Sequence, residues 1–394
     1  MTCTYLDYNA TTPVDPRVLD AMLPYLREKF GNASSKGHAY GWAANEAVEA
    51  ARERVARLLG ASPREIIFTS GATEANNLTI LGLFGLKPEG KKRHVITQAT
   101  EHHAVLDTIE ELGRRGFEAT VLRPDSTGRV APEQVREAIT ERTLLVTIMA
   151  ANNEVGTLNP IEEIGRVCSA SGVLLHTDAA QAAGKIPLDV ERMGIDLLSI
   201  SGHKFYAPKG VGALYVRSRT PRIQLSPITF GGGQERGLRP GTLNVPGIVG
   251  LGEAARVARA DLPAESVRLR GLRDRLLESI RSNLSGVHRN GHAEECLPGT
   301  LSLSFEGIDG AALLVSLPDL AVSSGSACTT GSTEPSYVLK ALGVPDRLAF
   351  ATARFSVGRF TTEADVDRAA DRVTEVVSRL RGQLAAVGGA SGLP

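Results

Sequence analysis

Short apolar segments alternate with helical segments through the first two thirds of the chain, and this alternation limits the fold more than any other feature. Apolar, β-rich runs predict strands at residues 66–68, 94–97, 120–122, 144–148, 173–176, 197–200 and 213–216. Helical periodicity between them predicts helices at 45–59, 73–86, 104–115, 132–139 and 160–170. Because the strands are nearly continuous apolar runs, both faces of their sheet should be covered. We therefore predict an α/β fold with a mainly parallel sheet and helices on both faces.

The last third of the chain has a different pattern. A long helical stretch at 247–284 precedes a strand-like run at 301–305 and helical segments at 311–317 and 362–384. This order predicts a smaller α+β unit, to which the long helix forms the bridge. We place the large domain at residues 15–260 and the small domain at residues 1–14 plus 261–394. The length of 394 residues is sufficient for two hydrophobic cores.

Charge and cysteine content restrict the class of protein. The 44 basic and 44 acidic residues cancel, so the overall charge does not favour nucleic acid as a direct partner. The four cysteines contain no CxxC pair, which is typical of a reducing compartment. The N-terminal residues lack the pattern of a signal peptide, and no apolar run is long enough to span a membrane. We expect a cytoplasmic protein that does not associate with membranes.

The sequence predicts no intrinsic metal site. His288, His292 and Cys296 are spaced four residues apart, but Asn290-Gly291 interrupts any helix that would align them. We expect no functional role for Cys3, Cys168 or Cys296, which fall near the terminus, on a helix face and in a loop.

Lys204 is the most informative single residue. The apolar, β-rich run 195–200 is followed by Ser201-Gly202-His203, then by Lys204, and two aromatic residues come next. A lysine desolvated at the end of a buried strand loses proton affinity and can react as a neutral amine with a carbonyl cofactor. The alternative is a strand-edge lysine whose ammonium group reaches water.

A run of small residues between a predicted strand and a predicted helix suggests an anion site. Residues 68–75 read FTSGATEA, so backbone N–H groups at the start of the helix and the Thr73 hydroxyl can bind a phosphate. An ordinary helix N-cap has the same appearance. The segment matches neither the P-loop motif nor the GxGxxG dinucleotide turn.

Other polar side chains follow strands at the carboxyl edge of the predicted sheet, where open α/β sheets bind ligands. Asp178 directly follows a buried strand, and its carboxylate can keep a pyridine nitrogen protonated. Gln181 is placed to bond a ring oxygen, and an imidazole at His102 can stack on a flat ring and transfer protons. Asn153 follows the strand at 144–148. Taken singly, Asp178 can be only a helix cap; together these groups suit a phosphorylated pyridine aldehyde.

Cys328 lies in the segment 323–336, which consists mostly of Ser, Thr and Gly. Such a segment should be an exposed loop. A thiolate there can act as a second nucleophile that approaches the substrate and then carries the product away. The alternative is an incidental exposed cysteine.

In this order, these motifs resemble the cysteine desulfurases, pyridoxal-phosphate enzymes of the aspartate-aminotransferase fold (fold type I). The resemblance extends from about residue 5 to residue 384. It is carried by YLDYNATTP (5–13), GN (31–32), TSGATE (69–74), TEH (100–102), NNE (152–154), SGHK (201–204), GGGQERG (231–237), SSGSAC (323–328) and RFS (354–356).

The resemblance implies roles for the residues that bind the cofactor, pyridoxal 5'-phosphate. Lys204 would form a Schiff base with it, Asp178 would pair with the ring nitrogen, and Gln181 with the ring hydroxyl. His102 would stack on the ring and take part in catalysis. The phosphate would be held by Ala72, Thr73, Ser201, Gly202 and His203, with Thr242 reaching from the partner subunit of a homodimer.

The resemblance also implies the reaction. Asn153 would contact both the cofactor and the carboxylate of L-cysteine. Arg354 would hold that carboxylate, although an arginine is more commonly part of a surface ion pair. Cys328 would take the substrate sulfur as a persulfide and release L-alanine. The sulfur would pass to an acceptor protein, either an iron–sulfur scaffold or an enzyme that thiolates tRNA or modifies DNA. Cys328 would be at most a transient iron–sulfur ligand.

Three alternatives remain at this point. A selenocysteine lyase would turn over selenocysteine without Cys328. A sulfur-carrier or scaffold subunit would contain no bound cofactor. An aminotransferase of the same fold would produce a keto acid in place of alanine.

Overall fold

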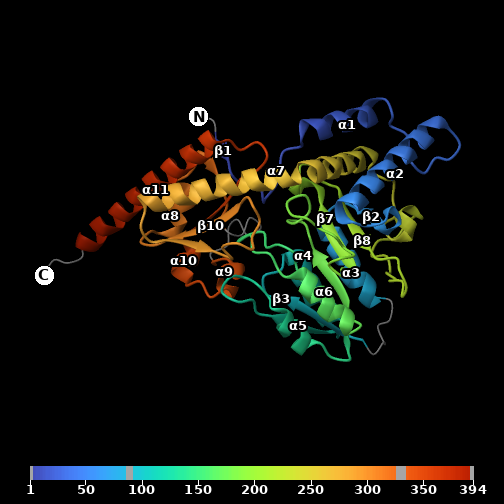
Figure 1. Cartoon of the computed structure of the whole chain (residues 1–394), viewed down its shortest axis with the longest axis horizontal. Helices are drawn as coiled ribbons and strands as arrows, with labels where there is room; N and C mark the ends of the chain where they lie inside the picture. Colours follow the sequence, from blue (N-terminus) through green and yellow to red (C-terminus); the bar gives the residue numbers. More distant parts are fainter. Residues whose placement is uncertain (1–2, 86–91, 325–333, 391–394) are drawn as a thin grey trace.

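A seven-stranded sheet forms the centre of the larger part of the molecule (Figure 1). The computed structural model describes residues 3–85, 92–324 and 334–390, with side chains through residue 384. The strands of this sheet are β2 (Ile66–Thr69), β3 (His94–Gln98), β4 (Glu118–Leu122), β5 (Thr143–Thr147), β6 (Leu174–Asp178), β7 (Leu197–Ser201) and β8 (Gly212–Val216). Their order is β2-β8-β7-β6-β5-β3-β4, and only β8 runs antiparallel to its neighbours. The predicted mainly parallel sheet is confirmed.

Helices cover both faces of this sheet. They are α1 (Pro16–Arg27), α2 (Ala39–Leu59), α3 (Ala72–Gly85), α4 (His103–Arg114), α5 (Pro132–Ala138), α6 (Ile161–Ala170) and α7 (Val245–Asn283). Successive strand residues point to opposite faces. Ile66 and Phe68 accordingly pack in one hydrophobic cluster with α2, α6 and α7, whereas Ile67 packs in another with α3 and α4. The apolar strand sequences are therefore explained by burial on both sides.

A second, smaller unit surrounds a three-stranded antiparallel sheet. Its order is β12 (Thr352–Ser356), β10 (Thr300–Phe305), β9 (Val287–Asn290), and a parallel pair joins β1 (Thr4–Tyr5) to β11 (Leu320–Ala321). The helices of this unit are α8 (Gly310–Val315), α9 (Tyr337–Ala341), α10 (Asp346–Phe350) and α11 (Glu363–Ala390). Because β1 pairs with β11, the N-terminal segment lies against this unit and close to the carboxyl edge of the large sheet.

Helix α7 connects the two units (Figure 1). Its first half places Ile248 and Leu251 in the core of the larger unit, and its second half places Leu272 and Leu276 in the core of the smaller one. The predicted bridging helix is therefore confirmed. Among the described residues, no helix combines the length and hydropathy that crossing a bilayer requires.

Some elements are absent from the sequence-based prediction. Helix α1 begins with Pro16 at its first position and the Asp15 side chain accepting a hydrogen bond from the Arg17 N–H group, which are ordinary start signals. Helix α2 begins earlier than residue 45 because the His38 ring caps the Gly41 N–H group. Strand β12 pairs along its whole length with β10, and this pairing makes it a strand.

Candidate active site

The carboxyl ends of β2, β3, β5, β6 and β7 meet around a cavity of about 570 Å³. The small unit and the N-terminal segment complete its wall, with Arg354 from β12 and with Asn9 and Ala10. The cavity lining brings together the predicted residues Ala72, Thr73, His102, Asn153, Asp178, Gln181, Ser201, His203, Lys204 and Arg354. These side chains come from segments more than 280 residues apart in the sequence, so only the fold makes them neighbours.

Three predicted residues are not among the described residues that line the cavity. Gly202 is buried in the turn that carries His203 and Lys204, outside the cavity lining. Thr242 is exposed and also lies outside the lining. Cys328 lies outside the described residues, as does most of the predicted loop 323–336.

One end of the cavity is the N-terminus of α3, where Ala72 and Thr73 begin the helix. The first N–H groups of a helix have no intrahelical acceptor and attract anions. Gly212 on β8 keeps this turn close to the sheet, because a Cβ atom there would lie 2.6 Å from Gly71 Cα and 2.4 Å from the Ile200 carbonyl oxygen. The Ser201 side chain, from the end of β7, faces the same turn.

Lys204 ends a short 3-10 helix, Gly202–Lys204, that follows β7. Its amine donates hydrogen bonds to the backbone oxygens of Asn9, at 2.8 Å, and Ala10, at 2.9 Å. Lys204 is half-buried and lines the cavity, with its amine held against the N-terminal segment.

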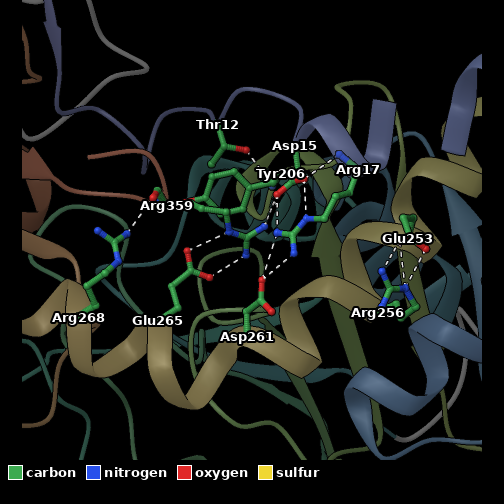
Figure 2. A network of polar contacts seen from close by, with 10 residues as sticks. All are labelled: Thr12, Asp15, Arg17, Tyr206, Glu253, Arg256, Asp261, Glu265, Arg268 and Arg359. Carbon is green, nitrogen blue, oxygen red and sulfur yellow. Dashed lines mark hydrogen bonds and ion pairs between the residues drawn. The ribbon is translucent and has the colours of Figure 1, made fainter. Parts of the chain in front are cut away.

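Ten residues form a network of polar contacts around the turn that follows Lys204 (Figure 2). We call it the joint network; its members are Thr12, Asp15, Arg17, Tyr206, Glu253, Arg256, Asp261, Glu265, Arg268 and Arg359. Tyr206 has a positive φ of 71°, which is unusual for a bulky residue. Its N–H group donates to the Thr12 hydroxyl at 2.8 Å, and its carbonyl oxygen accepts from the Asp15 N–H group. Its ring lies under the Arg359 guanidinium, 4.2 Å from ring centroid to Cζ. Its hydroxyl accepts a hydrogen bond from the backbone N–H group of Arg359. These contacts together hold the strained backbone conformation of Tyr206.

Charged partners complete the joint network. Arg359 pairs with Glu265 of α7 and with Asp15, each at 2.7 Å, and Asp15 also pairs with Arg17. The Arg17 side chain, with Arg359 adding to it, holds the pKa of Asp15 well below its usual range. Figure 2 shows Glu265 and Asp261 of α7 directed toward these arginines. This network ties α7, the N-terminal segment and the small unit to the back of the Lys204 turn.

Asp178 ends β6 and lines the same cavity. Its Oδ2 atom accepts from the Asn76 amide at 2.7 Å, and its Oδ1 atom accepts from the Ala180 N–H group. Its side chain is buried within the residues that line the cavity, so its carboxylate is available to a group bound there.

His102 caps α4, because its Nδ1 atom accepts a hydrogen bond from the Ala104 N–H group at 3.0 Å. Burial lowers the pKa of the imidazole, which nearby Asp178 opposes and Lys204 reinforces. A neutral ring that accepts at Nδ1 carries its proton on Nε2.

Gln181 has both ends of its amide engaged. Its Nε2 atom donates to the Asn9 backbone oxygen at 2.8 Å, and its Oε1 atom accepts from the Lys185 amine at 2.7 Å. Lys185 also donates to Asn9 Oδ1 at 3.2 Å. Burial, with the charges of Lys204 and Arg354 adding to it, lowers the pKa of Lys185 to about 7.

Arg354 is almost fully buried, with 1% of its surface exposed. It donates to Asp7 Oδ1 at 2.7 Å and to the Asn153 backbone oxygen at 2.9 Å. Within the described part of the chain, Arg354 Nε and Asn153 Oδ1 are buried and have no hydrogen-bond partner. A buried cationic donor and a buried amide oxygen at one cavity wall therefore have unused bonding capacity.

Two buried carboxyl groups lie behind this wall. Glu101 accepts from the Met149 N–H group and the Gln98 amide, and burial raises its pKa to about 8. Glu154 accepts from the Ser336 hydroxyl at 2.5 Å, and burial raises its pKa to about 7. Ser336 caps α9, so Glu154 fixes the start of that helix beside the cavity.

The residues present fit pyridoxal 5'-phosphate. The first N–H groups of α3 and the small side chains beside them match a phosphate, and the Asp178 carboxylate matches a ring nitrogen. Lys204 lines the same cavity. Among residues 3–85, 92–324 and 334–384, no cluster of three His, Cys, Asp or Glu side chains is arranged to hold a metal ion.

Sequence reasoning assigned no individual role to Asp7, Asn9 or Lys185. Asp7 and Asn9 belong to the quoted motif at 5–13, but their partners are more than 140 residues away in the sequence. Lys185 follows Ala182-Ala183-Gly184 and precedes Ile186. A lysine in such a small, apolar stretch is the same kind of signal that identified Lys204.

Comparison with known proteins gives a consistent result. The family model for class-V aminotransferases matches residues 4–369. The cysteine desulfurase IscS of Anaeromyxobacter dehalogenans (strain 2CP-C) is 54% identical over 377 residues, covering 96% of this chain and 93% of that protein. The solved structure of a NifS-like protein has a TM-score of 0.89 at 41% identity, covering 96% of this chain and 100% of that one. The structure of SspA in complex with cysteine has a TM-score of 0.81 at 42% identity, covering 91% and 100%.

Proposed function

The chain belongs to the class-V aminotransferase family and, within it, to the cysteine desulfurases, and we propose that Lys204, Arg354 and Cys328 carry out its chemistry. A cysteine desulfurase removes the sulfur atom of L-cysteine and releases L-alanine. The observation that supports these assignments best is the cavity itself, where Lys204 and Arg354 line one space with Asp178 and His102.

The cofactor is assigned to the residues of this cavity. Bound pyridoxal 5'-phosphate supplies an aldehyde for an amine and an electron sink for changes at the carbons of an amino acid. Lys204 would hold the aldehyde carbon and Asp178 the ring nitrogen, while Gln181 would donate to the ring hydroxyl. His102 would cover one ring face and shield it from water. The phosphate would take N–H groups of Ala72 and Thr73, the side chains of Ser201 and His203, and the Gly202 backbone.

The substrate carboxylate is assigned to Arg354 and Asn153. Arg354 has a buried Nε–H without a partner in the described part of the chain, and a carboxylate is the natural acceptor for it. Asp7 already binds another arm of the same guanidinium, so it orients the group. SspA, at 42% identity, was solved with cysteine, which supports L-cysteine as the substrate here.

Proton transfer is assigned to Lys204 and His102. The Lys204 amine, once free of the cofactor, takes the Cα proton of the substrate. His102 is held with its proton on Nε2 by the Ala104 N–H group, so it can pass a proton at that atom.

Cys328 is assigned as the sulfur acceptor. Its thiolate attacks the sulfur of the bound cysteine, an S–S bond forms and the C–S bond breaks. The electron pair of the C–S bond stays with the carbon, which takes a proton and leaves as part of alanine. The persulfide then passes to an acceptor protein for iron–sulfur assembly or nucleic-acid thiolation, a reaction expected in the cytoplasm.

A homodimer is proposed because a cluster of aromatic side chains is exposed. Phe30, Tyr40 and Trp42 are each more than half exposed, and Phe230 is 86% exposed. The rings of Phe30 and Tyr40 lie 5.4 Å apart, and segments 33–36 and 233–236 line one surface hollow. A second copy that covers this face would bring its own Thr242 toward the phosphate end of the cavity. The division into domains of residues 15–260 and 1–14 plus 261–394 is part of the same proposal.

Two variants test the proposed chemistry. Cys328→Ser should keep the visible absorbance of the bound cofactor but form no alanine from L-cysteine. Lys204→Ala should lose that absorbance as well as activity. Full alanine formation by either variant would refute its assignment.

A further inference from the structure

Lys185 is a second lysine at the candidate active site, and the proposed chemistry gives it no task. It lies in the turn after β6, four residues after Gln181. Its amine donates to Gln181 Oε1 at 2.7 Å and to Asn9 Oδ1 at 3.2 Å. Both acceptors are amide oxygens, so these hydrogen bonds do not make an ion pair.

The local backbone directs Lys185 inward. Gly184, just before it, has a φ of +73°, and a Cβ atom there would lie 2.9 Å from Phe205 Cβ. Only glycine lets this turn pack so closely against the residue that follows Lys204. The turn therefore brings Lys185 beside Asn9, the residue that Lys204 also contacts.

Keeping an amine in this position costs free energy. Burial and the positive charges of Lys204 and Arg354 both disfavour the ammonium form, which is why the pKa of Lys185 lies near 7. An apolar side chain of the same length would avoid this cost. The hydrogen bonds of Lys185 are therefore the feature that distinguishes it from an apolar residue.

The hydrogen bond from Lys185 and the Asn9 backbone oxygen together determine which way the Gln181 amide points. With Oε1 against Lys185, Nε2 donates one hydrogen to the Asn9 backbone oxygen. The second Nε2 hydrogen is left for the cavity, which Gln181 lines. A flipped amide would place Oε1 against the Asn9 oxygen, acceptor against acceptor. The Lys185 amine can donate to both amide oxygens whether it is charged or neutral, because even the neutral amine carries two hydrogens.

We propose that Lys185 is a positioning residue that holds the Gln181 amide with its N–H group toward the ring oxygen of the bound cofactor. The inference rests on the proposed function, in which Gln181 meets that oxygen. It predicts that Lys185 matters for a cofactor that has the ring hydroxyl and not for one that lacks it.

The test compares two ligands on purified apoprotein. Equilibrium dissociation constants are measured by absorbance for pyridoxal 5'-phosphate and for its 3-deoxy analogue, which has hydrogen in place of the ring hydroxyl. The variants are Lys185→Met, the reference Gln181→Leu and the control Lys92→Met, an exposed lysine before β3 at the opposite edge of the sheet. Thermal unfolding shows that each variant is folded. If Lys185→Met does not fold, Lys185→Gln, whose amide is too short to keep the contact, takes its place.

A hydrogen bond to an ionised oxygen is typically worth about tenfold or more in affinity, so Lys185→Met should weaken pyridoxal 5'-phosphate about tenfold. Its effect on the 3-deoxy analogue should be less than about twofold, which is the scatter of neighbouring substitutions. Gln181→Leu should show the same selectivity, and Lys92→Met should change neither constant.

Two failures are distinguishable. If Gln181→Leu discriminates between the ligands and Lys185→Met weakens both equally or neither, Lys185 does not act through Gln181 and the inference is overturned. If Gln181→Leu itself does not discriminate, the assignment of Gln181 to the ring oxygen in the proposed function is wrong, and the inference fails with it.

Discussion

The joint network and the cavity wall are both polar and built from distant segments, yet they differ in how their hydrogen bonds are used. All the side chains in Figure 2 lie in the described part of the chain, and none has a buried polar atom without a partner. At the cavity wall, Asn76 Oδ1, Asn153 Oδ1 and Arg354 Nε are buried and unpartnered among the described residues. A buried polar atom without a partner needs an explanation, and at a cavity wall a bound group can supply one.

Carboxyl groups show the same contrast. Asp15, in the joint network, lies between Arg17 and Arg359, and its pKa is lowered. Glu101 and Glu154, behind the cavity, accept hydrogen bonds from neutral groups, and burial raises their pKa values to about 8 and about 7. Burial is common to all three, so the charge of the partners decides the direction.

Burial and charge alone therefore do not identify a functional site. Every buried side-chain polar atom of the joint network has a hydrogen-bond partner, which suits a structural role at the back of the Lys204 turn. The cavity wall has buried polar atoms without a partner among the described residues, which suits the binding of a cofactor and a substrate. Substitutions in the two regions should therefore change different properties of the protein.

The largest expected effect is on stability, from Arg359→Met. The substitution leaves Asp15 and Glu265 with fewer cationic partners and removes the group that covers Tyr206. Removing one partner of a buried pair typically costs about 3–5 kcal/mol. The urea unfolding midpoint measures it, with Arg368→Met, from an exposed pair, as the control. An unchanged midpoint would mean that the joint network is not structural.

Arg354→Lys tests the cavity wall. The lysine keeps the charge but loses the planar fork that binds a carboxylate through two hydrogen bonds. We expect kcat/KM for L-cysteine to fall about 30–100-fold, corresponding to roughly 2–3 kcal/mol. The loss should come mainly from a higher KM, with a smaller change in the unfolding midpoint than for Arg359→Met. A pure loss of stability with normal KM would contradict the assignment.

Glu154→Gln sharpens the contrast between the carboxyl groups. Because the folded protein holds the Glu154 proton more tightly than the unfolded chain, this residue favours folding below pH 4.5 and loses that contribution as pH rises to about 7. The substituted amide does not ionise, so the variant should lose about 1–3 kcal/mol less stability than the wild type between pH 5 and pH 7. Urea midpoints at both pH values measure this difference. Parallel pH profiles would show that Glu154 ionises normally.

The smallest effect is expected at an exposed ion pair. Glu118 and Arg142 are each about half exposed and 2.6 Å apart. Glu118→Gln should change the free energy of unfolding by less than about 0.5 kcal/mol, since water and salt screen such pairs. Differential scanning calorimetry provides the check. A shift comparable to that of Arg359→Met would remove the distinction between exposed pairs and the joint network.

Much of the fold could be predicted because its signals are local. Apolar runs predicted β2 to β8, and the end of each strand identified Lys204, Asp178 and His102 as neighbours. Strand ends gather at one sheet edge whatever the details of packing, which is why the cavity residues were accessible to sequence reasoning.

Long-range partners could not be predicted in the same way. Asp7 meets Arg354 across 347 residues, and Arg359 meets Asp15 across 344. No local pattern specifies such pairs, because they depend on how β1 and β12 are placed by the small unit. The start of α2 at a histidine cap and strand β12 were missed because tertiary contacts, and not propensity, decide them.

Borohydride reduction of the cofactor-loaded protein, followed by peptide mass spectrometry, tests the central claim most directly. Reduction turns the bond between cofactor and lysine into a stable amine that survives digestion. The account predicts one modified peptide, with the phosphopyridoxyl group on Lys204. A group on Lys185 or Lys209, or no modified lysine, would contradict it.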